Sequence, residues 1–229
     1  MKIVGAVNNH WLAIKNARLV PQPFWGYEDI GAFLLLAVFL GLILRLLVPL
    51  QFLSRFAIIN PSTGLQSAVV ALLGAGLYFI LRLRYRQPVL KPLGWVVPQR
   101  PYIVMALMVG PSFAAGIALY LRLCNQVPPT IPISELLILG LVFGPILEES
   151  LFRGCLLPVL AQSTGTIPAV IITAVIFAIF HGPTNLVHWL TFTATGIAYG
   201  WVRMASRSTT APVLMHAAYN LTFGLLAGA

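Results

Sequence analysis

The sequence predicts an all-α protein, a polytopic bundle of transmembrane helices. Of its 229 residues, 59% are hydrophobic and only 8% are charged, whereas an ordinary soluble domain is roughly 25% charged. The hydrophobic residues form repeated runs of about 20 residues, the length of helix that crosses a hydrocarbon layer. Because lipid cannot pair with backbone N–H and C=O groups, segments that cross it must be helical.

Seven such runs make up most of the chain. Turn-forming residues separate them, as in Asn60-Pro61-Ser62 and Gly182-Pro183. We therefore predict about seven spans, and an eighth helix formed by the N-terminal segment is the alternative. The predicted spans cover residues 30–53, 65–81, 102–121, 133–161, 167–181, 186–202 and 209–227.

The basic residues predict how these spans are oriented. Ten Lys and Arg side chains fall on the side that holds the N-terminus, and only Arg55 and Arg122 fall on the other. Since short cytoplasmic loops are enriched in Lys and Arg, we predict a cytoplasmic N-terminus and an external C-terminus. The net charge of +9 then reflects topology and contact with lipid headgroups, and no nucleic-acid partner is expected.

Neither the N-terminal segment nor the cysteines indicate a signal peptide, a disulfide framework or a metal site. Residues 1–29 lack the uninterrupted apolar region of a signal peptide, and we interpret them as a cytoplasmic or interfacial lead-in. Cys124 and Cys155 have neither CxxC nor Cys/His spacing, so we expect buried free thiols. No long linker divides the chain.

Charged residues inside a predicted span are the strongest functional indication. Glu148, Glu149 and Arg153 lie in the middle of the fourth span, where each charge costs about 2.5 to 3.5 kcal/mol on insertion scales. Glu149 and Arg153 are four residues apart on a helix, so they can form an ion pair. Glu148, about 100° around the helix, then faces a neighbouring surface and is suited to general acid or base chemistry.

Three further polar residues lie at a similar depth. His181 ends the fifth span, and His216 and Asn220 are four residues apart on one face of the seventh. At 1.5 Å of rise per residue, all three and Glu148 lie roughly 10 to 21 Å from the cytoplasmic ends of their spans. The sequence therefore predicts one polar site within the membrane.

Each of these residues also has a purely structural interpretation. Glu149 and Arg153 could form a structural ion pair, and His181 could cap a helix end. His216 and Asn220 could only link helices. Glu135, next to a predicted helix start, complements the helix dipole and is interpreted as structural. The coincidence in depth favours a site.

The motifs resemble those of the CPBP intramembrane protease family, which includes the type 2 CAAX prenyl endopeptidases and the Abi proteins. The family pattern is EExxxR, FxxxH, a glycine-bearing helix and HxxxN, in that order. This chain has Glu148-Glu149 to Arg153, Phe177 to His181, Phe192 to Gly200 and His216 to Asn220.

The resemblance implies a role for each residue. Glu148 and His181 would activate the attacking water, and His216 and Asn220 would stabilise the oxyanion. Glu149 and Arg153 would support them. Residues 129–229 would then be the catalytic region, and residues 30–128 would form three non-catalytic transmembrane helices. We favour a mechanism without a cofactor; zinc held by Glu148, His181 and His216 is the alternative.

The resemblance implies an intramembrane endopeptidase that cleaves a membrane-associated protein or peptide, and a CAAX-type prenylated protein is one candidate. Two other classes stay open at this point. A proton-coupled transporter could use the same buried residues as a relay. A non-catalytic scaffold or immunity protein could use them for helix packing. We expect an integral, multi-pass protein of the plasma (inner) membrane of a prokaryote, with membrane lipids around it and an undetermined oligomeric state.

Overall fold

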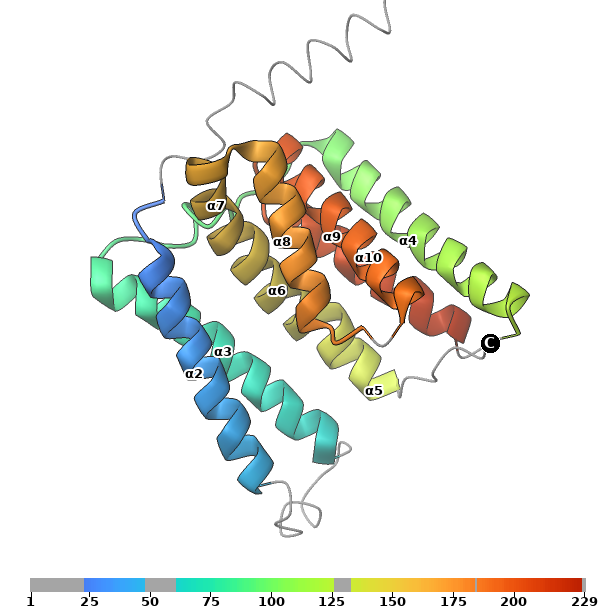
Figure 1. Ribbon diagram of the computed structural model, residues 1–229, viewed down its shortest axis with the longest axis horizontal. Helices are drawn as coiled ribbons and strands as arrows, with labels where there is room; N and C mark the ends of the chain where they lie inside the picture. The colour runs from blue at the N-terminus through green and yellow to red at the C-terminus, as the bar shows by residue number, and fades with distance from the viewer. Residues whose placement is uncertain (1–22, 48–60, 126–132, 184, 228–229) are drawn as a thin grey trace, which may run out of the picture.

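The computed structural model describes residues 23–47, 61–125, 133–183 and 185–227, and within these ranges every regular element is helical. The all-α prediction is confirmed for this part of the chain. Figure 1 shows the helices packed side by side in one bundle, in which α4 and α10 run in the same direction. The single helices are α2 (Tyr27–Leu47), α3 (Pro61–Tyr85), α4 (Arg100–Leu123), α8 (Thr166–Phe180), α9 (Leu186–Ser206) and α10 (Thr210–Ala227).

One further helix runs from residue 133 to residue 164, and we refer to it as the central helix. Two segments of it have the wider π-helical winding. Such segments are rare and occur frequently at functional sites. In chain order its parts are α5 (Ile133–Glu135), η2 (Leu136–Phe143), α6 (Gly144–Glu149), η3 (Ser150–Leu156) and α7 (Leu157–Thr164).

Over the described residues each predicted span coincides with one of these helices, and most helix ends differ from the predicted ends by a few residues. The predicted end of the first span, at residue 53, lies outside the described residues. Judged by length and composition alone, two described segments are long and apolar enough to cross a membrane: Ala68–Tyr85 and Arg100–Leu123. The count of seven membrane crossings therefore remains a prediction. Residues 1–22, most of the predicted lead-in with its alternative eighth helix, lie outside the described residues, as does the predicted boundary at residues 128 and 129.

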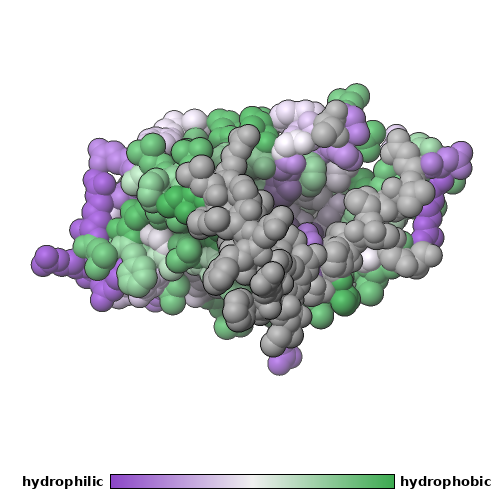
Figure 2. All heavy atoms as spheres, turned by 90° about the horizontal axis from the view of Figure 1, so that it is seen from below, coloured by the Kyte–Doolittle hydropathy of each residue, from purple (hydrophilic) through white to green (hydrophobic). Residues whose placement is uncertain are grey.

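Large apolar side chains cover the outside of the bundle. Leu35 is 73% exposed and Leu123 is 75% exposed, and similar side chains continue along α3, α4 and α8. Figure 2 shows hydrophobic atoms spread over the face that is seen from below Figure 1. An apolar surface of this extent is compatible with lipid as the surrounding medium. Charged residues such as Glu149 and Arg153 are instead fully buried.

Small residues allow the helices to approach closely. On α9, a Cβ atom added to Gly196 would lie 3.0 Å from the Cα of Ala174, and one added to Gly200 would lie 3.0 Å from Val170 Cγ1. Gly196 and Gly200, which are four residues apart, therefore bring α9 close to α8. Without side chains at these two positions, α8 and α9 pack directly against each other.

The contact between α4 and α10 is closer still. Four buried small residues at a spacing of four line one face of α4: Ala106, Gly110, Ala114 and Ala118. A Cβ atom on Gly110 would collide with the carbonyl oxygen of Met215, next to His216. The position of α10 therefore depends on a helix outside the region with the family motifs.

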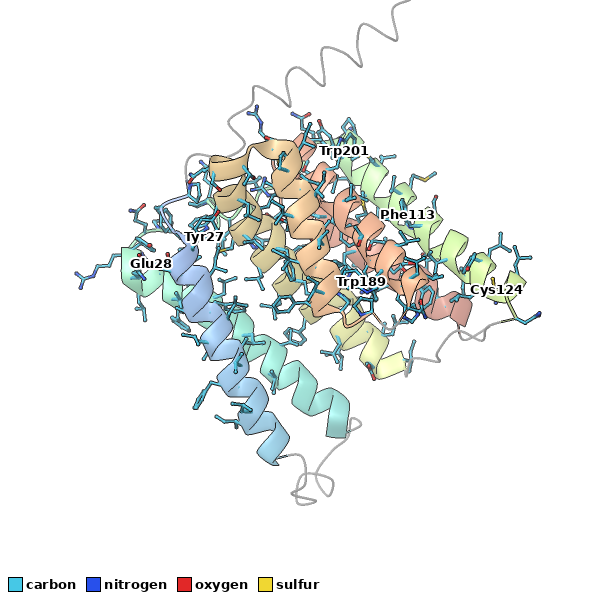
Figure 3. The ribbon with its side chains drawn as sticks, viewed as in Figure 1. Tyr27, Glu28, Phe113, Cys124, Trp189 and Trp201 are labelled. Carbon is cyan, nitrogen blue, oxygen red and sulfur yellow. The ribbon has the colours of Figure 1, made fainter. Side chains whose placement is uncertain are left out.

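The segment between α3 and α4 closes one end of the bundle. The indole Nε1 of Trp95 donates to Ser150 Oγ at 3.1 Å. Thr209 N donates to the carbonyl of Gly94 at 2.7 Å, and Gly94 has a φ of 86° that favours glycine. Figure 3 places Tyr27 and Trp201 toward this end and Cys124 at the opposite end.

The prediction of buried thiols is confirmed for Cys155 and wrong for Cys124, which is exposed after the last residue of α4.

Gly110→Ala is expected to destabilise the protein, because the added methyl group collides with backbone that cannot move without displacing α10. Overpacking of this kind costs about 1 to 3 kcal/mol, which lowers Tm by about 3 to 10 °C for a chain of this size. Thermal unfolding of the purified protein in detergent measures the effect. Gly116→Ala is the matched control on the same helix, because nothing lies within 4 Å of its added Cβ; equal Tm values for the two variants would contradict the packing argument.

Candidate active site

All four predicted catalytic residues line one cavity of about 460 Å³. Its walls come from α3, the first half of the central helix, α8, α9 and α10. The polar or ionisable side chains among its lining residues are Glu135, Glu148, His181, Thr195, Tyr199, His216, Tyr219 and Asn220. The predicted supporting residues, Glu149 and Arg153, do not line the cavity but lie behind its wall. Residues far apart in sequence are thus brought to one place.

The two adjacent glutamates occupy different environments because they are on different faces of α6. Glu148 faces the cavity and its side chain is 31% exposed, whereas Glu149 is completely buried. Wider helical turns border this short segment on both sides, with Gly144 N donating to Leu139 O and Leu157 N donating to Phe152 O. One carboxylate is therefore available to a ligand, and the other is available only to protein.

Glu148 and His181 face each other at the wall of the cavity. The distance from Glu148 Oε2 to His181 Nε2 is 3.6 Å, which is too long for a direct hydrogen bond. His181 Nδ1 donates to the carbonyl of Phe177 at 2.8 Å, which leaves Nε2 directed at the carboxylate. The imidazole lies between two aromatic rings, with centroids at 4.2 Å for Phe177 and 4.5 Å for Phe192. These contacts fix the ring at the end of α8.

Glu149 joins Arg153 to His216. Its Oε1 accepts a hydrogen bond from Arg153 Nη1 at 3.1 Å and another from His216 Nδ1 at 3.0 Å. The first is the ion pair predicted from the spacing of four residues. The second was not predicted, because it connects residues 67 positions apart. Since the carboxylate can only accept from Nδ1, the other ring nitrogen of His216, Nε2, remains available for the cavity.

Arg153 extends this cluster to α9. Its Nη2 donates to the carbonyl of Gly196 at 2.9 Å, a contact that the absence of a side chain at Gly196 makes accessible. The guanidinium carbon lies 4.4 Å from the ring centroid of Phe177 and 5.2 Å from that of Tyr199. Aromatic faces stabilise a buried cation in this position. One arginine thus connects the central helix to α8 and α9.

Asn220 is connected to a π-helical turn. Its Nδ2 donates to the carbonyl of Gly140 at 2.8 Å, which orients the amide at the cavity wall and leaves the second N–H of the group. Side chains also reach the carbonyls of the other π-helical segment, where Trp25 Nε1 donates to Cys155 O at 3.1 Å. In both cases a side chain distant in sequence donates a hydrogen bond to a backbone carbonyl of a π-helical segment.

Zinc, the alternative to a mechanism without a cofactor, would need three protein ligands close together. Among the described residues, no three His, Cys, Asp or Glu side chains are grouped closely enough to hold one metal ion. The set Glu148, His181 and His216 does not form such a group in this arrangement, and we derive no step through a metal.

Sequence reasoning missed several residues of the cavity, among them Tyr199 and Gly140, and the place of Glu135 on its wall. Tyr199 stacks on His216 with a centroid distance of 4.9 Å and an interplanar angle of 20°. Gly140 supplies the carbonyl that holds Asn220. Glu135 was interpreted as structural from its position at a helix start, yet it also lines the cavity. Tyr199 had an indication in the sequence, since it precedes Gly200 in the glycine-bearing helix.

The fold and the site define a class, a helical membrane protein with a carboxylate and histidine centre inside the bundle. Within that class, residues 130–222 match the family model described as type II CAAX prenyl endopeptidase Rce1-like. This segment is therefore Rce1-like, and the family recognised from the motifs is confirmed over less than half of the chain.

A curated relative gives a second comparison. The Bacillus subtilis (strain 168) protein named "Putative membrane peptidase YdiL" is 32% identical over 85 residues, which are 37% of this chain and 34% of that protein. The match thus spans about a third of the length of this relative. No solved structure matches the chain. Both matches indicate an integral membrane protein and place the matched segment in a family of membrane peptidases.

Glu149→Gln is expected to destabilise the folded protein, because it leaves Arg153 buried without its anionic partner. Breaking a buried ion pair by removing one member costs about 3 to 5 kcal/mol. The matched control is Glu28→Gln, which removes an 80% exposed partner of Arg84 and should cost less than about 1 kcal/mol. Thermal unfolding in detergent compares the two, and a Glu149→Gln protein as stable as the control would contradict the assigned role.

Proposed function

We propose that this protein is an intramembrane endopeptidase that hydrolyses a peptide bond through water activated by Glu148 and His181. The observation that carries the proposal is the cavity that unites Glu148, His181, His216 and Asn220. A volume of about 460 Å³ lies within the usual range for ligand sites of about 300 to 1,000 Å³. The Rce1-like match supports proteolysis over other uses of buried Glu and His.

The geometry suits a water held between Glu148 and His181. Atoms that are 3.6 Å apart can each hydrogen-bond to the same water at about 2.8 Å. Glu148, as the carboxylate, takes a proton while the water oxygen attacks the carbonyl carbon of the substrate. The proton then passes to the leaving nitrogen as the C–N bond breaks, which yields a carboxylic acid and an amine. His181 holds and orients the water through Nε2.

The oxyanion formed in this step needs donors fixed in place before the reaction. The second N–H of Asn220 is one donor in this proposal, and Nε2 of His216 is the other. Because Nδ1 of His216 already donates to Glu149, Nε2 carries a proton only when the ring is an imidazolium. Glu149, itself paired with Arg153, stabilises that cation. The second glutamate therefore acts through His216 and is a positioning residue.

We also propose a glutamate-type mechanism and a multi-pass topology in the plasma (inner) membrane of a prokaryote, with the N-terminus in the cytoplasm. Support for this orientation comes from exposed basic residues such as Arg86, Lys91 and Arg207, which lie at the end closed by residues 86–99. The lining of the cavity comes instead from the other half of the bundle. A substrate would then enter from the non-cytoplasmic side.

The substrate in this proposal is a membrane-associated peptide or protein. A CAAX-type prenylated protein is one candidate, since the matching family model carries that substrate in its description. The apolar walls of the cavity, which include Leu136, Leu139 and Phe223, support a substrate that is partly embedded in lipid.

Glu148→Gln and His181→Ala are each expected to reduce cleavage of a membrane-peptide substrate by at least about 100-fold, because each removes a contact to the attacking water. Asn220→Ala should lose about 100-fold in kcat through one oxyanion donor. The substrate is found by comparing membrane peptides in cells with active protein and in cells with the Glu148→Gln variant, and rates are then measured with purified protein. The Glu28→Gln variant controls for surface charge. Proteolysis that persists in purified, folded Glu148→Gln protein would refute the mechanism.

The orientation has a test built into the chain, because Cys124 is exposed and Cys155 is buried. A membrane-impermeant maleimide should label Cys124 in intact cells, and Cys124→Ser should abolish the label. Gln87→Cys in that background, at the opposite end, should be labelled only after the membrane is opened. The reverse pattern would show a non-cytoplasmic N-terminus.

A further inference from the structure

The charge of the cavity is opposite to that of the chain. The sequence has 14 Lys and Arg residues and five Asp and Glu residues. Two of those five acids, Glu135 and Glu148, line the cavity, and no Lys or Arg is among its described lining residues. The other three are already paired, Glu28 and Asp29 with Arg84 and Glu149 with Arg153.

Glu135 differs from these paired acids. It is the last residue of α5, at the start of the central helix, and is partly exposed. No hydrogen bond or ion pair of its side chain occurs within the described part of the chain. A carboxylate that only complements the helix dipole can face in any direction, but this one lies on the cavity wall with Val69 and Val70 of α3.

We propose that Glu135 is a specificity-determining residue that selects peptides with a positively charged side chain. A carboxylate beside apolar walls attracts a cation more strongly than one in bulk water does. The same walls offer no Lys or Arg to a free C-terminal carboxylate. This inference rests on the proposed endopeptidase function and defines its substrate as a peptide with Lys or Arg at a fixed distance from the cleaved bond.

The helix sets that distance. Glu135 precedes Glu148 by 13 positions, which corresponds to about 15 to 20 Å along the central helix. An extended peptide covers about 3.3 Å per residue, so this distance spans roughly five or six residues. A basic side chain is therefore expected five or six residues from the cleaved bond and not next to it.

The test uses the purified full-length protein in liposomes and a series of cleavable peptides in which a single Lys is moved from two to eight residues from the cleaved bond. Matched peptides carry Gln or Glu at the same position, and each is made with a free or an amidated C-terminus. We expect Lys at five or six residues to lower KM about fivefold relative to Gln, and Glu to raise it. Glu135→Gln should remove this difference in KM between the Lys and Gln peptides, and Glu135→Asp should retain it.

A Lys preference that persists in Glu135→Gln, or a wild-type protein that cleaves all the peptides with equal KM, would overturn the inference and leave the proposed function intact. Failure of the wild-type protein to cleave any peptide would instead count against the proposed function. Binding of the Lys and Gln peptides to the His181→Ala protein then decides separately whether the cavity selects charge. Tm values for the Glu135 variants exclude a folding defect, and Glu28→Gln is the control for loss of an acid outside the cavity.

Discussion

The buried carboxylate of Glu149 is the interaction on which the rest of the site depends. It accepts from Arg153 on the central helix and from His216 on α10, and Arg153 in turn donates to Gly196 on α9. Three helices are thereby connected through one oxygen atom and one guanidinium. In a bundle surrounded by lipid, a buried charge without a partner costs several kcal/mol, so any displacement of these helices is opposed strongly.

This constraint separates the two neighbouring glutamates into different chemical roles. Glu149 is fully enclosed, whereas Glu148 remains open to the cavity with one oxygen atom near His181. Adjacent residues on a helix differ by about 100° in direction, which places one side chain in the packed interior and the other at a surface. A paired acidic motif can thus supply both a reactive group and the support for its partners.

Helices outside the Rce1-like segment also shape the site. Gly110 of α4 lies against the backbone of α10 beside His216, and Val69 and Val70 of α3 form part of the cavity wall. Trp25, which precedes α2, donates to the carbonyl of Cys155 in the central helix. The N-terminal half of the chain therefore does more than anchor the protein, and the cavity is a property of the whole bundle.

The sequence by itself determined the helical class and the approximate helix positions, because long apolar runs leave the backbone no alternative in lipid. It also predicted the Glu149–Arg153 pair, since a spacing of four residues is a local property of a helix. The contact of Glu149 with His216, the attachment of Asn220 to Gly140 and the position of Glu135 on the cavity wall were decided only by the tertiary structure. Each depends on how separate helices pack and where a π-helical turn changes the direction of side chains, which no local pattern encodes.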